Sequence, residues 1–115
     1  MENINIEHLS IIKGEQLSSV IFVQDYLQLD FDGPLLTCYK WPKVCIAGII
    51  TSFGDSEYRN AICQLISYLV IALEASSSEV LIRFDIGYIQ FLMPDDSEVI
   101  FFQDNDKKWS YYPVR

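Results

Sequence analysis

Apolar and polar residues alternate along the first 42 residues of the chain. Leu27, Leu29 and Phe31 fall on one face of an extended segment, and polar or tyrosine side chains fall on the other face. Asp32-Gly33 follows, and both residue types tolerate the positive φ of a tight hairpin turn. Pro42 ends the alternation, because proline cannot donate a hydrogen bond to a neighbouring strand. The pattern predicts three antiparallel strands, at Leu17–Val23, Tyr26–Asp32 and Leu35–Trp41.

The middle of the chain changes from alternation to a continuous apolar run and then to helical spacing. Val44–Phe53 is apolar and β-branched around Gly48, which predicts a buried strand with a bulge. Asp55 or Ser56 is the expected N-cap of a helix between Asp55 and Ser67. The apolar stripe of this helix consists of Ala61, Ile62, Leu65 and Ile66.

The pattern of the first strands recurs 53 residues later. This shift places Phe31 on Phe84, and one inserted residue then places Gly33 on Gly87. An internal duplication explains the recurrence, although alternating strands align with one another easily. The two units of the duplication are residues 12–42 and 65–94. The second unit and the tail have predicted strands at Tyr68–Glu74, Glu79–Asp85, Tyr88–Met93, Val99–Gln103 and Trp109–Val114.

These elements predict a single α+β domain over residues 1–115. It is mainly antiparallel β-sheet from two similar three-stranded units, with one central helix and a C-terminal hairpin. Met1–Ser10 is weakly amphipathic, and we expect it to be loosely held. The residues predicted to be buried together are Leu27, Leu29, Phe31, Ile62, Leu65, Ile82 and Phe84.

Composition places this domain in the cytoplasm. The longest apolar run, Cys45–Ile50, is far shorter than the roughly 20 residues that span a bilayer. The segment Met1–Glu7 carries acids where a secretory signal would carry Lys or Arg. The chain has three cysteines and no C-x-x-C spacing, which disfavours both a disulfide framework and a structural zinc site.

The charge balance bears on the class of partner. Sixteen acids face eight bases, so the net charge is −8. Nucleic acid and anionic membrane surfaces select clusters of Lys and Arg and would repel such a chain. A basic protein would be attracted, although solubility alone also explains an acidic composition.

Candidate catalytic residues are scarce. His8 is the one histidine, and in the loosely held amino-terminal segment it is expected to be a surface residue without a task. Asp30 and Asp32 share a strand face as a glycosidase pair would, but acids are ordinary on an exposed face. The sequence contains neither a phosphate-binding glycine loop nor a metal-ligand spacing. We therefore predict a protein that is not an enzyme and that uses no cofactor and no metal.

Tyrosine and tryptophan are abundant for so small a domain, and these residues anchor protein interfaces because they bury large areas at little entropic cost. Filling of the core explains part of this set. Two surfaces combine aromatic residues with acids and are the candidates for partner binding. The first consists of Tyr26, Asp30 and Asp32, and the second of Trp41, Asp55, Glu57 and Tyr58.

Three blocks of the sequence resemble a family of small bacterial proteins without an assigned function. They are Phe22–Gly33, Leu36–Pro42 and Gly54–Arg59, and the last is followed by Cys63 and Leu65-Ile66. The resemblance implies no catalytic residue. The small, acidic α+β character is also similar in type to that of the immunity proteins that neutralise bacterial toxins.

Our leading hypothesis from the sequence is an immunity-type protein. It would bind and neutralise a cognate bacterial toxin, such as a basic nuclease, through an acidic surface that contains aromatic residues. The alternative is a non-catalytic binding or scaffolding module, homodimeric through an open sheet edge. An enzyme that acts through surface carboxylates is the third and least favoured class.

Overall fold

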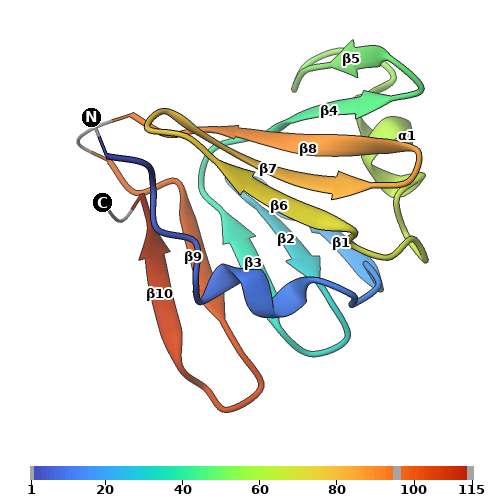
Figure 1. Ribbon diagram of the computed structural model, residues 1–115. Helices are drawn as coiled ribbons and strands as arrows, with labels where there is room; N and C mark the ends of the chain where they lie inside the picture. Colours follow the sequence, from blue (N-terminus) through green and yellow to red (C-terminus); the bar gives the residue numbers. More distant parts are fainter. Residues whose placement is uncertain (1, 95–96, 114–115) are drawn as a thin grey trace.

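The chain forms two five-stranded antiparallel sheets (Figure 1), and the computed structural model describes residues 2–94 and 97–113. The strand order is β1-β2-β3-β9-β10 in the first sheet and β5-β4-β8-β7-β6 in the second. The helices are a short 3-10 helix, η1 (Leu9–Ile12), and one α-helix, α1 (Tyr58–Cys63). The strands are β1 (Ser19–Phe22), β2 (Leu27–Asp30), β3 (Leu35–Cys38), β4 (Lys43–Ile46), β5 (Ile49–Thr51), β6 (Ala72–Ala75), β7 (Glu79–Phe84), β8 (Gly87–Leu92), β9 (Ile100–Gln103) and β10 (Trp109–Tyr112). The prediction of a mainly antiparallel α+β fold is therefore confirmed.

Each sheet combines strands from both halves of the chain. The meander β1-β2-β3 is followed by the hairpin β4-β5, which pairs with β8 in the other sheet. The meander β6-β7-β8 is followed by the hairpin β9-β10, which returns to pair with β3. In Figure 1 the strands of the second sheet run across the view above those of the first sheet, which run down it. Neither sheet is therefore complete without a hairpin from the other half.

The two meanders share one register. Ser19 pairs with Asp30 in the first, and Ala72 pairs with Arg83 in the second, which is a shift of 53 residues. The same shift relates the β2–β3 pairs to the β7–β8 pairs. The register therefore continues through the turn without the one-residue insertion that we placed before Gly33 and Gly87, and that detail of the alignment is wrong.

The core lies between the sheets and is formed by the faces that the alternation predicts. All seven residues predicted to be buried together belong to one cluster of buried side chains. Leu27, Leu29, Ile62, Leu65 and Ile82 have no exposed surface. The large rings of the core come from Phe31, Tyr58, Phe84, Phe91, Phe102 and Tyr112.

The segment Val44–Phe53 is a hairpin and not one buried strand with a bulge, so that prediction is wrong. Ala47 and Gly48 have φ values of 50° and 82°, and two successive residues with positive φ form the tightest hairpin turn. The chain reverses there, and β5 becomes an edge strand. Ile49 and Ile50 on this strand are 69% and 56% exposed.

The helix is shorter than predicted at both ends. Its N-cap is Glu57, and not Asp55 or Ser56 as predicted. The carboxylate of Asp55 instead accepts a hydrogen bond from the Ser52 amide 2.8 Å away. Beyond Cys63 the chain continues in tight turns as far as Ser67. Ser67 has a φ of 82°, which is incompatible with a further helical turn. The Ser67 amide then donates to the carbonyl of Leu17, so tertiary pairing replaces the last helical turn.

The amino-terminal segment is not loosely held, contrary to our prediction. The side chains of Ile4, Leu9 and Ile12 are buried in the core. The Ile4 amide donates to the Ser76 carbonyl at 2.9 Å, and the Leu9 amide donates to the Tyr112 hydroxyl at 2.9 Å. Apolar anchors at both ends of this segment fix it across the sheets. Val114, in the last predicted strand, lies outside the described residues.

Within the described ranges, 2–94 and 97–113, no helix is long and apolar enough to cross a membrane.

Replacing Phe31 or Phe84 with alanine should lower the free energy of unfolding by about 3–5 kcal/mol, because each change leaves a cavity in the shared core. Urea denaturation measures this difference. Leu92→Ala, at a residue that is 56% exposed, is the control and should cost less than about 0.5 kcal/mol. If the Phe31 variant is as stable as the Leu92 variant, the core is not where we place it.

Candidate functional site

Four aromatic rings gather where β1, the β3–β4 connection, the segment after β5 and α1 meet. Trp41 stacks on Phe53 with ring centroids 4.2 Å apart and an interplanar angle of 15°. Phe22 stacks on Trp41 at 6.5 Å. Tyr58 meets the rings of Trp41 and Phe53 edge-on, at 6.4 and 6.0 Å. We call these four residues the Trp41 cluster.

The base of the Trp41 cluster is buried and fixed. Tyr58 is 2% exposed, and its hydroxyl donates to the carbonyl of Pro42 at 2.6 Å. Burial raises the pKa of Tyr58, so the phenol stays protonated and keeps this bond. Helix α1 thereby holds the Trp41-Pro42 turn by both a hydrogen bond and ring packing.

The outer part of the Trp41 cluster is open. Trp41 is half-buried, whereas Phe53 is 56% exposed although it stacks on Trp41. The guanidinium of Arg59 lies 5.7 Å from the centre of the Phe22 ring. A cavity of about 260 Å³ lies beside these rings, lined by Phe53, Gly54, Asp55, Ser56, Tyr58 and Arg59.

The structure brings the second predicted surface together at this cluster. Asp55 and Tyr58 line the same cavity, and Trp41 packs against Tyr58. Glu57 is exposed at the N-cap of α1, where its carboxylate accepts from the Asn60 side chain at 3.3 Å. Tyr58 is a support for this surface and not an exposed contact, because its ring is buried. Phe53, which the sequence analysis missed, is the exposed ring.

The first predicted surface is spread out along β2. Tyr26 precedes the strand and Asp32 lies in the turn that follows it, so the two residues lie at opposite ends of β2. The carboxylate of Asp30 accepts from the Gly33 amide at 2.8 Å, and Asp32 has a φ of 59°. These two acids shape the turn between β2 and β3.

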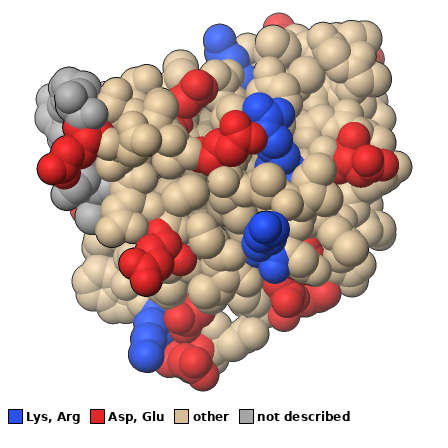
Figure 2. All heavy atoms as spheres, viewed as in Figure 1, with Lys and Arg blue, Asp and Glu red and all other residues tan. Residues whose placement is uncertain are grey.

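Charged residues of both signs are mixed on the face that Figure 2 shows. Acidic side chains are spread over this face, and Lys and Arg lie between them. Among the described residues, Arg83 forms an ion pair with Glu74, and the His8 imidazole is hydrogen-bonded to Asp104. On this face the acidic side chains are therefore scattered and do not form one continuous patch.

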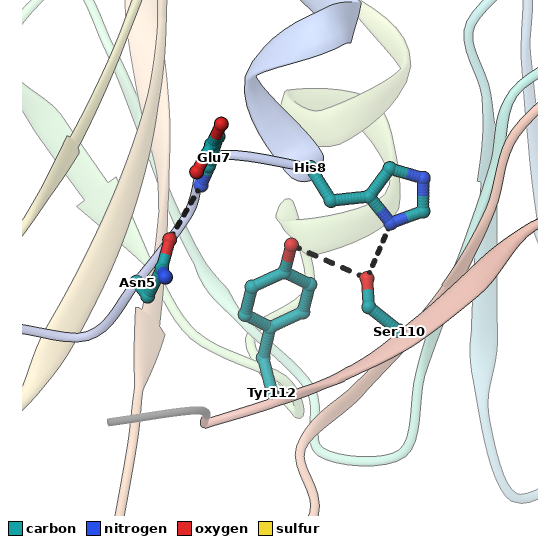
Figure 3. A pocket seen from close by; sticks show the side chains of 5 residues that line it. All are labelled: Asn5, Glu7, His8, Ser110 and Tyr112. Atoms are coloured by element: carbon teal, nitrogen blue, oxygen red, sulfur yellow. Dashed lines mark hydrogen bonds between the residues drawn. The ribbon is translucent and has the colours of Figure 1, made fainter.

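A second constellation joins the amino-terminal segment to the β9–β10 hairpin. His8 Nδ1 lies 2.8 Å from Ser110 Oγ, and His8 Nε2 lies 2.8 Å from Asp104 Oδ2. Ser110 Oγ is also 3.3 Å from the Tyr112 hydroxyl (Figure 3). We call these four side chains the His8 relay. The imidazole packs edge-on against Phe102, with ring centroids 4.9 Å apart.

His8 is therefore half-buried and hydrogen-bonded through both ring nitrogens, and it is not the loosely held surface residue that we predicted. Its partners are separated from it by 96 and 102 positions in sequence, so no local pattern signals the contact. The only part of the His8 relay that the sequence indicates is the spacing of Ser110 and Tyr112, which places both hydroxyl groups on one face of a strand. The contact depends on how the amino-terminal segment docks on the sheet.

Asp104 is held by several donors. One oxygen faces His8, and the other accepts from the amides of Asp106 and Lys108 at 2.9 and 3.0 Å. The hydrogen bond from His8 lowers the pKa of Asp104, and the two backbone amides act in the same direction. A cavity of about 330 Å³ adjoins the His8 relay, lined by Asn5, Glu7, His8, Ser110 and Tyr112.

The cysteines and acids offer little further chemistry. Cys38 and Cys45 are buried, Cys63 is exposed, and the three thiols are free. Burial raises the pKa of Cys38 and of Cys63, which disfavours the reactive thiolate form. In the part of the chain that the structure describes, no group of three or more His, Cys, Asp or Glu side chains is arranged to hold a metal ion.

Comparison of the chain with protein-family models, with curated proteins and with solved structures finds no match. The resemblance of the Phe22–Gly33 block to a bacterial family stays a prediction. The geometry of the Trp41 cluster and of the His8 relay is therefore the basis for the proposals below.

The pKa shift of Asp104 predicts how stability depends on pH. A lowered pKa in the folded state means that folding favours the carboxylate, so its stabilising effect is present above the unfolded pKa of about 3.9. The effect is lost as the pH falls through the lower folded pKa. The stability difference between wild type and Asp104→Asn should therefore shrink as the pH is lowered from 6 to about 2.5. Urea midpoints at several pH values test this, and a difference independent of pH would contradict it.

Proposed function

We propose that this protein binds a protein partner through the Trp41 cluster, as an immunity-type inhibitor of a cognate bacterial toxin. The observation that carries the proposal is the stacked pair of Trp41 and Phe53, which exposes 56% of the Phe53 surface above a buried Tyr58. Rigid aromatic side chains of this kind are the usual anchors of protein interfaces.

The stacked pair is already ordered before a partner arrives. Trp41 is fixed between Phe22 and Phe53, and α1 supports it through Tyr58. Binding therefore costs little side-chain entropy, which is a large part of the cost at flexible surfaces. A preorganised aromatic surface supports tight binding of a partner with a complementary cleft.

Exposed apolar residues continue from the cluster onto the edge of the second sheet. Ile49 and Ile50 on β5 are mostly exposed, and Phe53 follows two residues after this strand ends. Scattered apolar residues are ordinary on a protein surface, whereas a run of them within one short segment favours an interface. The residues from β5 to Phe53 therefore extend the proposed contact area.

Charge supports a basic partner. The net charge is −8, and Asp55 and Glu57 are exposed beside the Trp41 cluster. A negative field speeds the encounter with a positively charged protein, while contacts made by the rings set the lifetime of the complex. A basic nuclease toxin is a suitable partner, because the acids of this protein would imitate the phosphates of the nuclease's substrate.

The alternative is a binding or scaffolding module that forms a homodimer through β5. This strand is the edge of its sheet, so its outer backbone groups pair with no other strand in the part of the chain that the structure describes, and Ile49 and Ile50 expose apolar side chains on it. The two proposals differ in one respect that can be measured. A homodimer requires β5 of a second copy, whereas an inhibitor forms a complex of two different chains.

We also propose that residues 12–42 and 65–94 are an internal duplication of a three-stranded unit. The shared register of the two meanders supports this. The isolated antiparallel bridge between Gln16 and Leu69 adds to it, because these residues are themselves 53 positions apart. A pair of equivalent residues facing each other is what a local two-fold axis produces. Gly14 and Ser67 also correspond and have similar φ values, 89° and 82°.

Phe53→Ala should weaken binding of the cognate toxin by about 2 kcal/mol or more, roughly 30-fold, because it removes the exposed ring. The free energy of unfolding should fall by only about 1 kcal/mol, because the ring loses its stacking on Trp41 but is 56% exposed. The double variant Asp55→Asn with Glu57→Gln should instead slow association and reduce its dependence on salt. The proposal predicts a toxin gene next to this one. The product of that gene is the ligand, and its binding is measured by surface plasmon resonance and by protection on co-expression.

Asp32→Asn is the matched control for this experiment. It removes one acid that lies outside the Trp41 cluster, and asparagine tolerates the φ of 59° at this turn. We expect the control to bind as the wild type does. Full protection by both the Phe53 and the double variant would exclude this surface, and failure of the wild-type protein to protect would exclude the immunity function.

A further inference from the structure

The His8 relay places a hydroxyl, an imidazole and a carboxylate in one hydrogen-bonded series beside a cavity. We propose that Ser110 is a nucleophile activated by His8, and that the adjoining cavity accepts small carboxylic esters, which the site hydrolyses. This activity is separate from partner binding, because it uses the β9–β10 hairpin and the amino-terminal segment, and it departs from our prediction that the protein is not an enzyme. It rests on the positions of the atoms and not on any resemblance.

Asp104 sets the orientation of the imidazole. Its Oδ2 is 2.8 Å from His8 Nε2, so in the neutral ring the proton resides on Nε2. Nδ1 then presents its lone pair to Ser110 Oγ, also 2.8 Å away. Phe102 fixes the ring from one side, and the backbone amides of the hairpin turn fix Asp104. A positioned general base is therefore in contact with the serine.

The serine is reachable from the cavity. Ser110 is half-buried on β10, the edge strand of the first sheet, and it lines the cavity of about 330 Å³ together with His8. Figure 3 shows the Ser110 hydroxyl between the imidazole and the Tyr112 phenol. A volume at the lower end of the usual range for ligand pockets suits a small acyl group.

Tyr112 is placed to stabilise the negative charge that forms during the reaction. Its hydroxyl accepts a hydrogen bond from the Leu9 amide at 2.9 Å, which polarises the phenol and makes it a better donor. It lies 3.3 Å from Ser110 Oγ, next to the position of a carbonyl under attack. Asn5 also lines the cavity, and its side-chain oxygen accepts a hydrogen bond from the Glu7 amide at 3.0 Å.

The reaction balances without a cofactor. When an ester carbonyl accepts the hydrogen bond of Tyr112, the Ser110 proton turns to His8 Nδ1. Ser110 Oγ bonds to the carbonyl carbon, and its proton passes to His8, whose positive charge Asp104 stabilises. The bond to the alcohol oxygen then breaks, and His8 protonates the departing alcohol. Water next attacks the acyl group on Ser110 with His8 as base, releasing the carboxylic acid and restoring the serine.

A fluorophosphonate probe tests this directly, because it phosphonylates activated serines and spares ordinary ones. Intact-mass and peptide analysis should find one adduct, on Ser110, and none in Ser110→Ala. Asp104→Asn should label at least about 10-fold more slowly, since the imidazole loses its orientation. Ser97→Ala, at an exposed serine outside both sites, should label at the wild-type rate. Absence of an adduct on Ser110 in the folded protein would overturn the proposal.

A second measurement remains informative if the Asp104 variant is unstable. In Ser110→Cys the introduced thiol should react with iodoacetamide at pH 6 at least about 10-fold faster than Cys63, because an adjacent imidazole favours the thiolate. Cys63 is exposed in the same molecule and has a raised pKa, so it is an internal reference. Equal or slower alkylation at position 110 would show that His8 serves only to fasten the amino-terminal segment.

Discussion

The exchange of hairpins between the two halves is the constraint on which the rest of the structure depends. β4 pairs with β8, and β9 pairs with β3, so each five-stranded sheet needs strands from both halves. Burial follows from this pairing, because Phe31 of the first half and Phe84 of the second lie in the same core. A chain of 115 residues obtains one continuous core in this way, which neither half would have alone.

Both candidate sites lie beside segments that become neighbours because the two halves exchange hairpins. The Trp41 cluster surrounds the connection by which the chain leaves the first sheet for the second, between β3 and β4. The His8 relay lies where the returning hairpin β9-β10 meets the amino-terminal segment. Connections held on a rigid frame are where proteins usually place function. Packing against Tyr58 fixes the position of Trp41, and hydrogen bonds to Asp104 and Ser110 fix the position of His8.

Sequence patterns predict the parts of this fold that depend on local periodicity. The burial of Leu27, Leu29 and Phe31 follows from a spacing of two, and the buried face of α1 follows from helical spacing. The β4–β5 hairpin was missed because Ala47 adopts a positive φ that alanine seldom takes, so Gly48 alone suggested a bulge. The helix ends early because Ser67 pairs with Leu17, which is a tertiary effect.

The residues of the candidate sites also differ in whether a local pattern in the sequence could predict them. Trp41, Asp55, Glu57 and Tyr58 could be named from the sequence because they lie in two short blocks that combine rings and acids. Phe53 could not, since it ends the apolar run Val44–Phe53, whose pattern predicts a buried strand. His8, Asp104 and Ser110 come from opposite ends of the chain, and only the docking of the amino-terminal segment unites them.

If the partner covers the Trp41 cluster, hydrogen–deuterium exchange of the complex with the toxin will show it. Residues 49–59, from β5 to the start of α1, should become strongly protected in the complex, because the partner excludes water from them. The turn between β2 and β3, at the far end of the first candidate surface, should exchange as it does in the free protein. Protection confined to that turn, with 49–59 unchanged, would contradict the account.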